Sequence, residues 1–208
     1  MLKIEGHILL PDYGTNTWLL WDDESLEAFL VDPAAPSGDL LKRIRELNLR
    51  VSFIINTHGH GDHIGGNAWF KQELSCRVMI HPADAHMLTD NRQNLSEYMG
   101  TPLVCQPADV LAEEGMDLSL GKHQVRIIHT PGHTPGCICL LVEKFLISGD
   151  TLFELSIGRT DFPGGSHTQI MNSIKHKLFV LPDDTVVFPG HGPRTSIGLE
   201  KKNNPFVR

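Results

Sequence analysis

The feature that most restricts the fold of this sequence is a histidine-rich segment, residues 57–63, which reads Thr-His-Gly-His-Gly-Asp-His. Four side chains that can bind a metal ion fall within six positions: His58, His60, Asp62 and His63. The run 51–56 before them is apolar and rich in β-branched residues, which indicates a buried strand. Residues 64–74 after them are expected to enter a helix. This histidine loop is therefore expected to connect a strand to a helix.

Glycines alternate with these side chains inside the histidine loop. We expect Gly59 and Gly61 to adopt positive φ angles that turn the neighbouring side chains inward. Imidazole and carboxylate donors together suit zinc, iron or manganese. The alternative is a histidine-rich surface loop, such as a tag or a weak metal scavenger. Tags lie at chain ends and lack a preceding apolar strand, so the segment favours a built metal site.

Composition indicates an ordinary globular chain of one domain. The 208 residues are 40% hydrophobic and 21% charged, which is enough to bury a full core. No apolar run approaches the roughly 18 residues that span a bilayer, and the N-terminus does not resemble a secretory signal. The net charge of −7 includes no basic block. We therefore expect a cytoplasmic protein with no membrane and no nucleic-acid partner.

The cysteines fit the same compartment. The chain contains four of them, Cys76, Cys105, Cys137 and Cys139, and no C-x-x-C pair. Cys137 and Cys139 would share one face of a strand that the apolar run 137–142 predicts. We expect buried, reduced thiols, as is usual in a reducing cytoplasm.

The rest of the pattern predicts a β meander followed by mixed strands and helices. The expected strands are 7–10, 17–21, 28–31, 51–56, 77–81, 125–129, 137–142, 145–148 and 185–188. Apolar residues at helical spacing predict a helix over 39–47, and further helices are expected over 83–88 and 168–178. Residues 90–108 are polar, hold two prolines and are expected to form an irregular excursion. Such long loops are usually functional or mobile.

Three more potential ligands lie at predicted strand ends or in turns between strands: His133, Asp150 and His191. Each directly follows a glycine. Because strands fix the direction of the chain, we expect these side chains to converge with the histidine loop on one rim of a sheet. The set holds five histidines and two aspartates, more than one four-coordinate ion can use. Two ions that share an aspartate, about 3.5–4 Å apart, would use all seven groups and suit hydrolysis.

This ordered pattern resembles the metallo-β-lactamase superfamily of hydrolases over nearly the whole chain. The resemblance implies an α+β fold, a four-layer αββα sandwich with the metals at one edge, and one such hydrolase domain over residues 1–208. It implies two divalent metal ions, with zinc favoured and iron or manganese as alternatives. The implied ligands are His58, His60 and His133 for the first metal, Asp62, His63 and His191 for the second, and Asp150 as the bridge.

Within the superfamily, the segments 150–153 and 191–195 resemble glyoxalase II-type thioester hydrolases. The longer enzymes of that type carry a C-terminal helical region that helps to hold glutathione. Only seventeen residues follow His191, so we expect the compact, single-domain branch. The loop 158–162 departs from the longer enzymes and also resembles the iron-dependent persulfide dioxygenases.

The resemblance implies hydrolysis of S-acylglutathione thioesters, such as S-lactoylglutathione, through a metal-bound hydroxide. The cationic site would favour a small anionic substrate of this kind. Asp62 is the candidate catalytic residue, which would orient the hydroxide or take part in proton transfer. Arg159 is the candidate for binding a substrate carboxylate, with a surface ion pair to Asp161 or Glu154 as the alternative. Asp32 either hydrogen-bonds the histidine loop or shapes a turn.

Other functions remain open at this point. An iron-dependent persulfide dioxygenase would need only three protein ligands and open positions for oxygen. A metallo-hydrolase of another small ester or thioester is a further alternative, and a non-enzymatic metal-storage role is the third. Because Asp62, His63 and His191 can complete a second metal site, the pattern favours hydrolysis.

Overall fold

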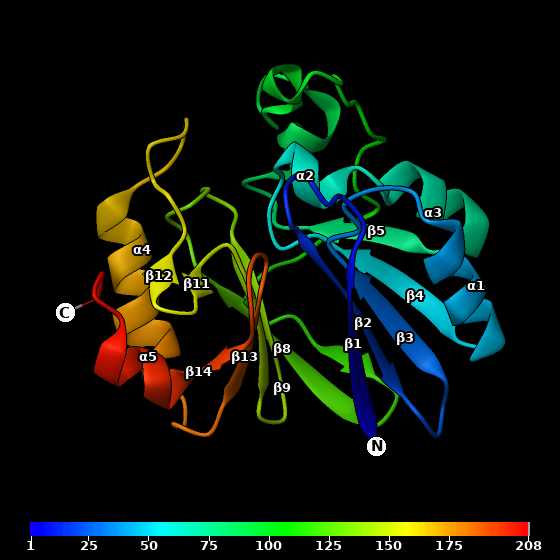
Figure 1. Ribbon diagram of the computed structural model, residues 1–208. Helices are drawn as coiled ribbons and strands as arrows, with labels where there is room; N and C mark the ends of the chain where they lie inside the picture. Colours follow the sequence, from blue (N-terminus) through cyan, green and yellow to red (C-terminus); the bar gives the residue numbers. More distant parts are fainter. Residues whose placement is uncertain (208) are drawn as a thin grey trace.

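Two six-stranded β-sheets face each other at the centre of the computed structural model, which describes residues 1–207 (Figure 1). The first sheet contains, in spatial order, β1 (Leu2–Ile8), β2 (Asn16–Asp22), β3 (Glu27–Val31), β4 (Arg50–Ile55), β5 (Arg77–Ile80) and β6 (Val110–Leu111). The second contains β14 (Thr195–Ser196), β13 (Val186–Pro189), β10 (Phe145–Gly149), β9 (Ile138–Val142), β8 (His123–His129) and β7 (Leu118–Leu120). A separate hairpin joins β11 (Leu152–Phe153) to β12 (Ser156–Ile157).

Helices cover the outer face of each sheet (Figure 1). The first sheet carries α1 (Gly38–Glu46) and α3 (Asn67–Leu74), and the second carries α4 (His167–Ser173), which continues into the π-helical turn η3 (Ile174–Leu178), and α5 (Ile197–Asn203). The short helix α2 (Gly61–Ile64) and the 3-10 turns η1 (Ala85–Thr89) and η2 (Ser96–Met99) lie near one edge. The expected four-layer αββα sandwich of the α+β class is confirmed.

Side-chain alternation along the strands explains the four layers. On β3, Phe29 and Val31 point into the core between the sheets, whereas Ala28 and Leu30 pack against the helices outside. On β9, Leu140 points between the sheets and Cys139 points toward the opposite helical layer. Successive side chains of a strand point to opposite faces, so strands that are apolar at every position must be covered on both sides.

The meander at the start of the chain is confirmed, because β1, β2 and β3 pair antiparallel. The predicted first strand 7–10 was wrong, since β1 spans Leu2–Ile8. The carbonyl of Leu10 instead accepts hydrogen bonds from the backbone N–H groups of Tyr13 and Gly14 in a turn. Leu2 and Ile4 alternate onto the central core, and this period-two pattern identifies the strand better than the apolar run after it.

Polar contacts join the two sheets at the edge where β2 meets β13. The Asn16 side chain donates to the carbonyls of Pro189, at 3.0 Å, and Gly192, at 2.8 Å. The indole N–H of Trp18 donates to the same Pro189 carbonyl at 3.0 Å. The first sheet is therefore tied to the segment that leaves β13.

The excursion 90–108 is an ordered structure that contains η2. The buried Asn94 side chain donates to the carbonyls of Met87 and Leu103, both at 3.0 Å. The Asn94 carbonyl accepts from the backbone N–H of Gly61 at 2.7 Å. These bonds anchor the excursion, drawn in green, beside α2 (Figure 1).

The cysteines are free and buried, as expected. Burial raises the pKa of the Cys76, Cys105 and Cys139 thiols to about 11, which keeps them protonated and unreactive near neutral pH. None of the helices formed by residues 1–207 is both long and apolar enough to span a membrane.

Removal of a side chain from the central core gives the first prediction. Leu140 is fully buried between the sheets, and we expect Leu140→Ala to lower the free energy of unfolding by about 2–5 kcal/mol, through lost burial and a residual cavity. Urea unfolding of the two proteins measures the difference. The control is Val180→Ala, at a side chain that is 68% exposed, with an expected change within about 0.5 kcal/mol. Equal effects of the two substitutions would contradict this description of the core.

Candidate metal centre

The histidine loop follows β4 and forms the N-terminal side of α2. His133 lies in the turn between β8 and β9, Asp150 directly follows β10, and His191 lies beyond β13. All these strand ends meet at one edge of the sandwich. The structure thus brings together every side chain of the predicted ligand set: His58, His60, Asp62, His63, His133, Asp150 and His191.

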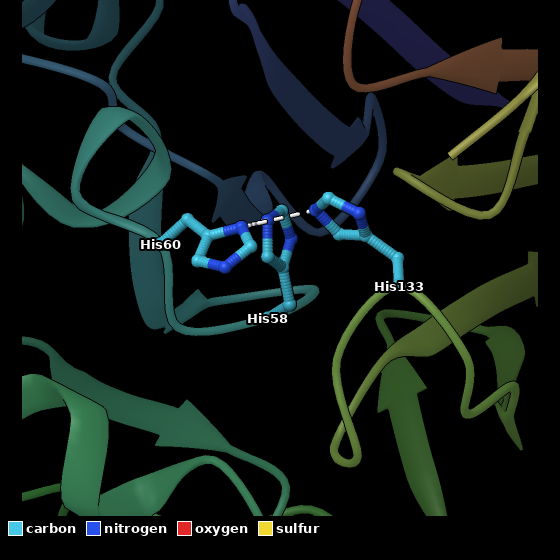
Figure 2. A group of neighbouring side chains, drawn as sticks. All are labelled: His58, His60 and His133. Atoms are coloured by element: carbon cyan, nitrogen blue, oxygen red, sulfur yellow. Dashed lines mark hydrogen bonds between the residues drawn. The ribbon is translucent and has the colours of Figure 1, made fainter. Parts of the chain in front are cut away.

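Three imidazole rings form the first donor cluster, His58, His60 and His133 (Figure 2). The Nδ1 atom of His60 lies 3.1 Å from Nε2 of His58 and 3.0 Å from Nε2 of His133. All three side chains are buried. Three nitrogen atoms therefore face one small volume that water hardly reaches.

The second donor cluster consists of Asp62, His63 and His191. The Nε2 atoms of His63 and His191 lie 3.2 Å apart. Oδ2 of Asp62 lies 3.3 Å from Nε2 of His191 and 3.5 Å from Nε2 of His63. The hydroxyl of Thr15 donates to the same carboxylate oxygen at 3.0 Å and fixes its orientation.

Asp150 lies between the two donor clusters. Its Oδ2 atom is 3.5 Å from Nε2 of His133 and 3.5 Å from Nε2 of His191. Its Oδ1 atom is 3.5 Å from Nε2 of His63, and this buried oxygen has no hydrogen-bond partner. A buried carboxylate oxygen without a donor is costly, so a cation between the clusters would satisfy it.

Hydrogen bonds outside the clusters determine which nitrogen of each ring faces inward. Nδ1 of His133 lies 2.7 Å from the carbonyl of Arg159, and Nδ1 of His191 lies 3.1 Å from the carbonyl of Tyr13. A carbonyl only accepts, so both Nδ1 atoms donate. In the neutral rings the inward Nε2 atoms then carry lone pairs, as metal ligands do.

The buried carboxylate of Asp32 orients two further rings. It accepts from Nδ1 of His63 at 3.0 Å and from the hydroxyl of Thr57 at 2.6 Å. Because this hydroxyl has given its proton to Asp32, it accepts from Nδ1 of His58 at 3.2 Å. The expectation that Asp32 hydrogen-bonds the histidine loop is confirmed, and the inward Nε2 atoms of both histidines are left free for a metal.

The donor set fits divalent metal ions. Burial and the neighbouring histidines lower the pKa of His58 far below its usual value, and burial and His133 lower that of His60 to about 3. These rings are therefore neutral near pH 7, and neutral nitrogens whose outward positions already donate have no proton to share at 3.0–3.1 Å. A cation resolves this arrangement, and nitrogen and carboxylate donors suit zinc or iron.

The carboxylates give the second cluster the opposite tendency. Burial opposes a charge on His63, but Asp62, Asp150 and Asp32 raise its pKa to about 10. Burial likewise opposes a charge on His191, whereas Asp62 and Asp150 raise its pKa. This negative field attracts a proton in the absence of metal, and a divalent cation would take the place of that proton.

Asp84 is a part of the centre that the sequence did not reveal. Its buried carboxylate accepts from the backbone N–H groups of Gly59, at 3.2 Å, and Gly136, at 2.7 Å, and from the hydroxyl of Thr134 at 2.6 Å. Gly59 lies between two histidines of the first cluster, and Thr134 and Gly136 lie beside the third. The one available signal was its position just after a predicted strand, where the other site residues also lie.

The glycines of the histidine loop act differently from the prediction. Neither Gly59 nor Gly61 has a positive φ angle. A side chain at Gly59 would come within 2.6 Å of Met87, and one at Gly61 within 2.9 Å of Ser96. These glycines therefore allow the segment 85–99 to pack directly on the histidine loop.

A cavity of about 720 Å³ opens over both donor clusters. The lining residues include Asp62, His60 and Arg159. The guanidinium of Arg159 pairs with Asp161, at 2.7 and 2.6 Å, as the alternative interpretation of this residue expected. Its substrate-binding role stays a prediction.

A family model described as the metallo-beta-lactamase superfamily matches residues 10–191. GloC of Haemophilus influenzae, a hydroxyacylglutathione hydrolase, is 37% identical over 199 residues, which are 94% of this chain and 93% of that protein. YqgX of Bacillus subtilis, a probable metallo-hydrolase, is 35% identical over 95% of this chain and 93% of that protein.

Solved structures are also similar over almost the entire chain. The BLEG-1 B3 metallo-beta-lactamase superposes with a TM-score of 0.92 at 36% identity, covering 99% of each chain. TTHA1623, solved in a di-iron-bound form, has a TM-score of 0.85 at 33% identity and covers 97% of this chain and 99% of that one. ETHE1 from Myxococcus xanthus has a TM-score of 0.83 at 29% identity, over 98% and 83%.

The placement of Asp150 between the clusters yields a prediction about metal content. We expect two ions per chain in the loaded protein. Asp150→Ala should weaken both ions, by more than the ~10–100-fold that follows loss of an outer hydrogen-bond partner, whereas His133→Ala should mainly weaken the first. Elemental analysis after dialysis against graded chelator measures this. The control is His86→Ala, at an exposed histidine, and loss of only one ion from Asp150→Ala would refute the shared role.

The contacts of Asp84 predict a separate effect on the first cluster. An amide oxygen cannot accept from all three donors, so Asp84→Asn should weaken the first ion about 10-fold and lower the free energy of unfolding by about 1–3 kcal/mol. The matched control is Asp109→Asn. Asp109 accepts from the backbone N–H of Val78 and from Lys71, away from the clusters, and its loss should lower stability but not metal affinity. Unchanged metal affinity in Asp84→Asn would show that Asp84 supports the fold alone.

Proposed function

The chain belongs to the metallo-β-lactamase superfamily, and on that premise we propose that it is a metal-dependent hydrolase of glutathione thioesters of the S-lactoylglutathione type. The observation that carries this proposal is the pair of adjacent donor clusters with Asp150 between them. The similarity to the hydroxyacylglutathione hydrolase GloC supports the substrate class.

The proposed ligands follow from the clusters. The first metal would be held by the cluster of His58, His60 and His133, the second by that of Asp62, His63 and His191, and Asp150 would contact both. When bound, the ions would lower the pKa of a water molecule and polarise the carbonyl of the thioester. Zinc is the first choice, and the di-iron form of TTHA1623 supports iron as the second.

Asp62 is the proposed catalytic residue. Burial opposes its charge, but His63 and His191 keep the pKa of its carboxyl well below the usual value. Thr15 occupies one lone pair of this carboxylate, and the side chain also faces the cavity. An ionised carboxylate in this position can accept a hydrogen bond from the attacking water and orient it toward the carbonyl.

Arg159 is the proposed group for a substrate carboxylate. It lines the cavity, and its own carbonyl orients His133. The side chain is 57% exposed, so a carboxylate can reach it, although that carboxylate must compete with Asp161. A small anionic molecule fits the cavity volume, which lies within the range of ligand sites, about 300–1,000 Å³.

An iron-dependent persulfide dioxygenase is the second candidate. The first cluster alone could hold one iron through three nitrogen donors and leave positions for oxygen. The similarity to ETHE1 supports keeping this candidate. The second cluster, with its two histidines and Asp62, favours hydrolysis instead.

Two assays on one preparation test the proposal. The purified protein, reconstituted in parallel with zinc and with iron, should hydrolyse S-lactoylglutathione at neutral pH without consuming oxygen, because the donor clusters hold two metals that activate water. Thioester absorbance and an oxygen electrode with glutathione persulfide provide the measurements. The control is Asp150→Ala, which should lose the thioesterase activity. Oxygen uptake without thioester loss would favour the dioxygenase, and no change in either assay would exclude both candidates.

A further inference from the structure

The cavity above the donor clusters has two apolar walls. One is formed by the excursion, with Leu95, Tyr98 and Met99. The facing wall is formed by Phe153 and Ile157, from the β11–β12 hairpin, and by the loop residues Phe162 and Pro163. The polar donors lie at the floor between them.

The excursion wall is built to present apolar side chains. Leu95 has a φ angle of +64°, a left-handed conformation that a bulky residue seldom adopts and that often marks a functional position. Its neighbour Asn94 is held on both sides, because its amide donates to two carbonyls and its Oδ1 accepts from the N–H of Ser96 at 2.9 Å. Tyr98, on η2, lines the cavity with 79% of its surface exposed.

Charged groups on the walls are few. Arg159 is the one lysine or arginine among the described residues that line the cavity. Its guanidinium is paired with Asp161 and lies 3.9 Å from the centre of the Phe162 ring. Because glutathione carries two carboxylates and an ammonium group, most of its charge finds no partner on these walls. Binding energy from the walls must therefore come mainly from apolar contact.

The apolar rings lie directly beside the metal-binding histidines. Phe162 packs edge-to-face on His60, with ring centres 5.6 Å apart, and Phe153 packs on His191 at 6.1 Å. A thioester carbonyl placed between the clusters would have its own acyl substituent against these rings. The part of the substrate that the walls contact is thus the group bonded to the reacting carbonyl.

From these contacts we infer that the site selects thioesters with an apolar, preferably aromatic, acyl group over those with a small hydroxyacyl group. This inference rests on the proposed thioester hydrolysis and specifies its substrate class. Tyr98, Met99 and Phe162 are the specificity-determining residues. They clasp the acyl group between the excursion and the facing wall while the donor clusters act on the carbonyl.

A matched pair of substrates tests the inference. S-(3-phenyllactoyl)glutathione differs from S-lactoylglutathione only by a phenyl group, so rates normalised to alkaline hydrolysis isolate the contribution of the walls. We expect kcat/KM to be at least about tenfold higher for the phenyl substrate, as for other apolar pockets. Tyr98→Ala should reduce this preference severalfold, and Tyr98→Phe should retain it. Val104→Ala is the control, on the same excursion but outside the cavity and 64% exposed.

Binding of thioethers separates this inference from the proposed function. S-benzylglutathione should bind the metal-loaded protein at least about tenfold more tightly than S-methylglutathione, measured by calorimetry, whether or not thioesters are hydrolysed. Hydrolysis of the lactoyl substrate without a phenyl preference would overturn the inference and leave the thioesterase in place. If neither thioester is hydrolysed, the proposed function fails, and equal binding of the two thioethers would then overturn the apolar site as well.

Discussion

A single buried carboxylate, that of Asp32, orients one ligand ring in each donor cluster. It receives the backbone N–H and the hydroxyl of Thr57, at 2.7 and 2.6 Å, and Nδ1 of His63 at 3.0 Å. Through Thr57 it also determines the tautomer of His58. The residue itself adopts a φ angle of +50° at the end of β3, a conformation that surrounding structure must hold in place. The metal centre therefore depends on the correct pairing of β3 with β4.

The floor and the walls of the cavity come from different kinds of structure. The donors of the floor follow strands of two packed sheets, and their positions are fixed by the same burial that stabilises the sandwich. The walls come from the excursion 90–108 and from residues 153–163, which contribute less to the core. Chemistry and substrate choice are thus separable. Changes in the walls can alter the substrate without moving a ligand, which agrees with the variety of names among the similar proteins.

Much of this arrangement could be predicted from the sequence, because strands and their ends leave local signals. Apolar runs located β4, β9 and β13, and the glycine before each of His133, Asp150 and His191 pointed to the shared edge. What could not be predicted depended on packing between distant segments. Asp84 is a metal-loop brace only because the sandwich brings η1 against the turn after β8, and the close packing at Gly59 has no local signature. The apolar walls were equally hidden, since Tyr98 and Phe162 are far apart in sequence.

The tie from Asn16 and Trp18 to Pro189 also concerns the motions of the molecule. Pro189 belongs to the strand that leads to His191, and Asp62 in the same cluster follows the other sheet. The second cluster is therefore assembled from both halves of the sandwich. Breathing of the two halves draws its members apart, so escape of an ion there and partial opening of the protein are one event. An ion that binds only the closed form acts as a clasp, and its concentration sets how often the sandwich opens.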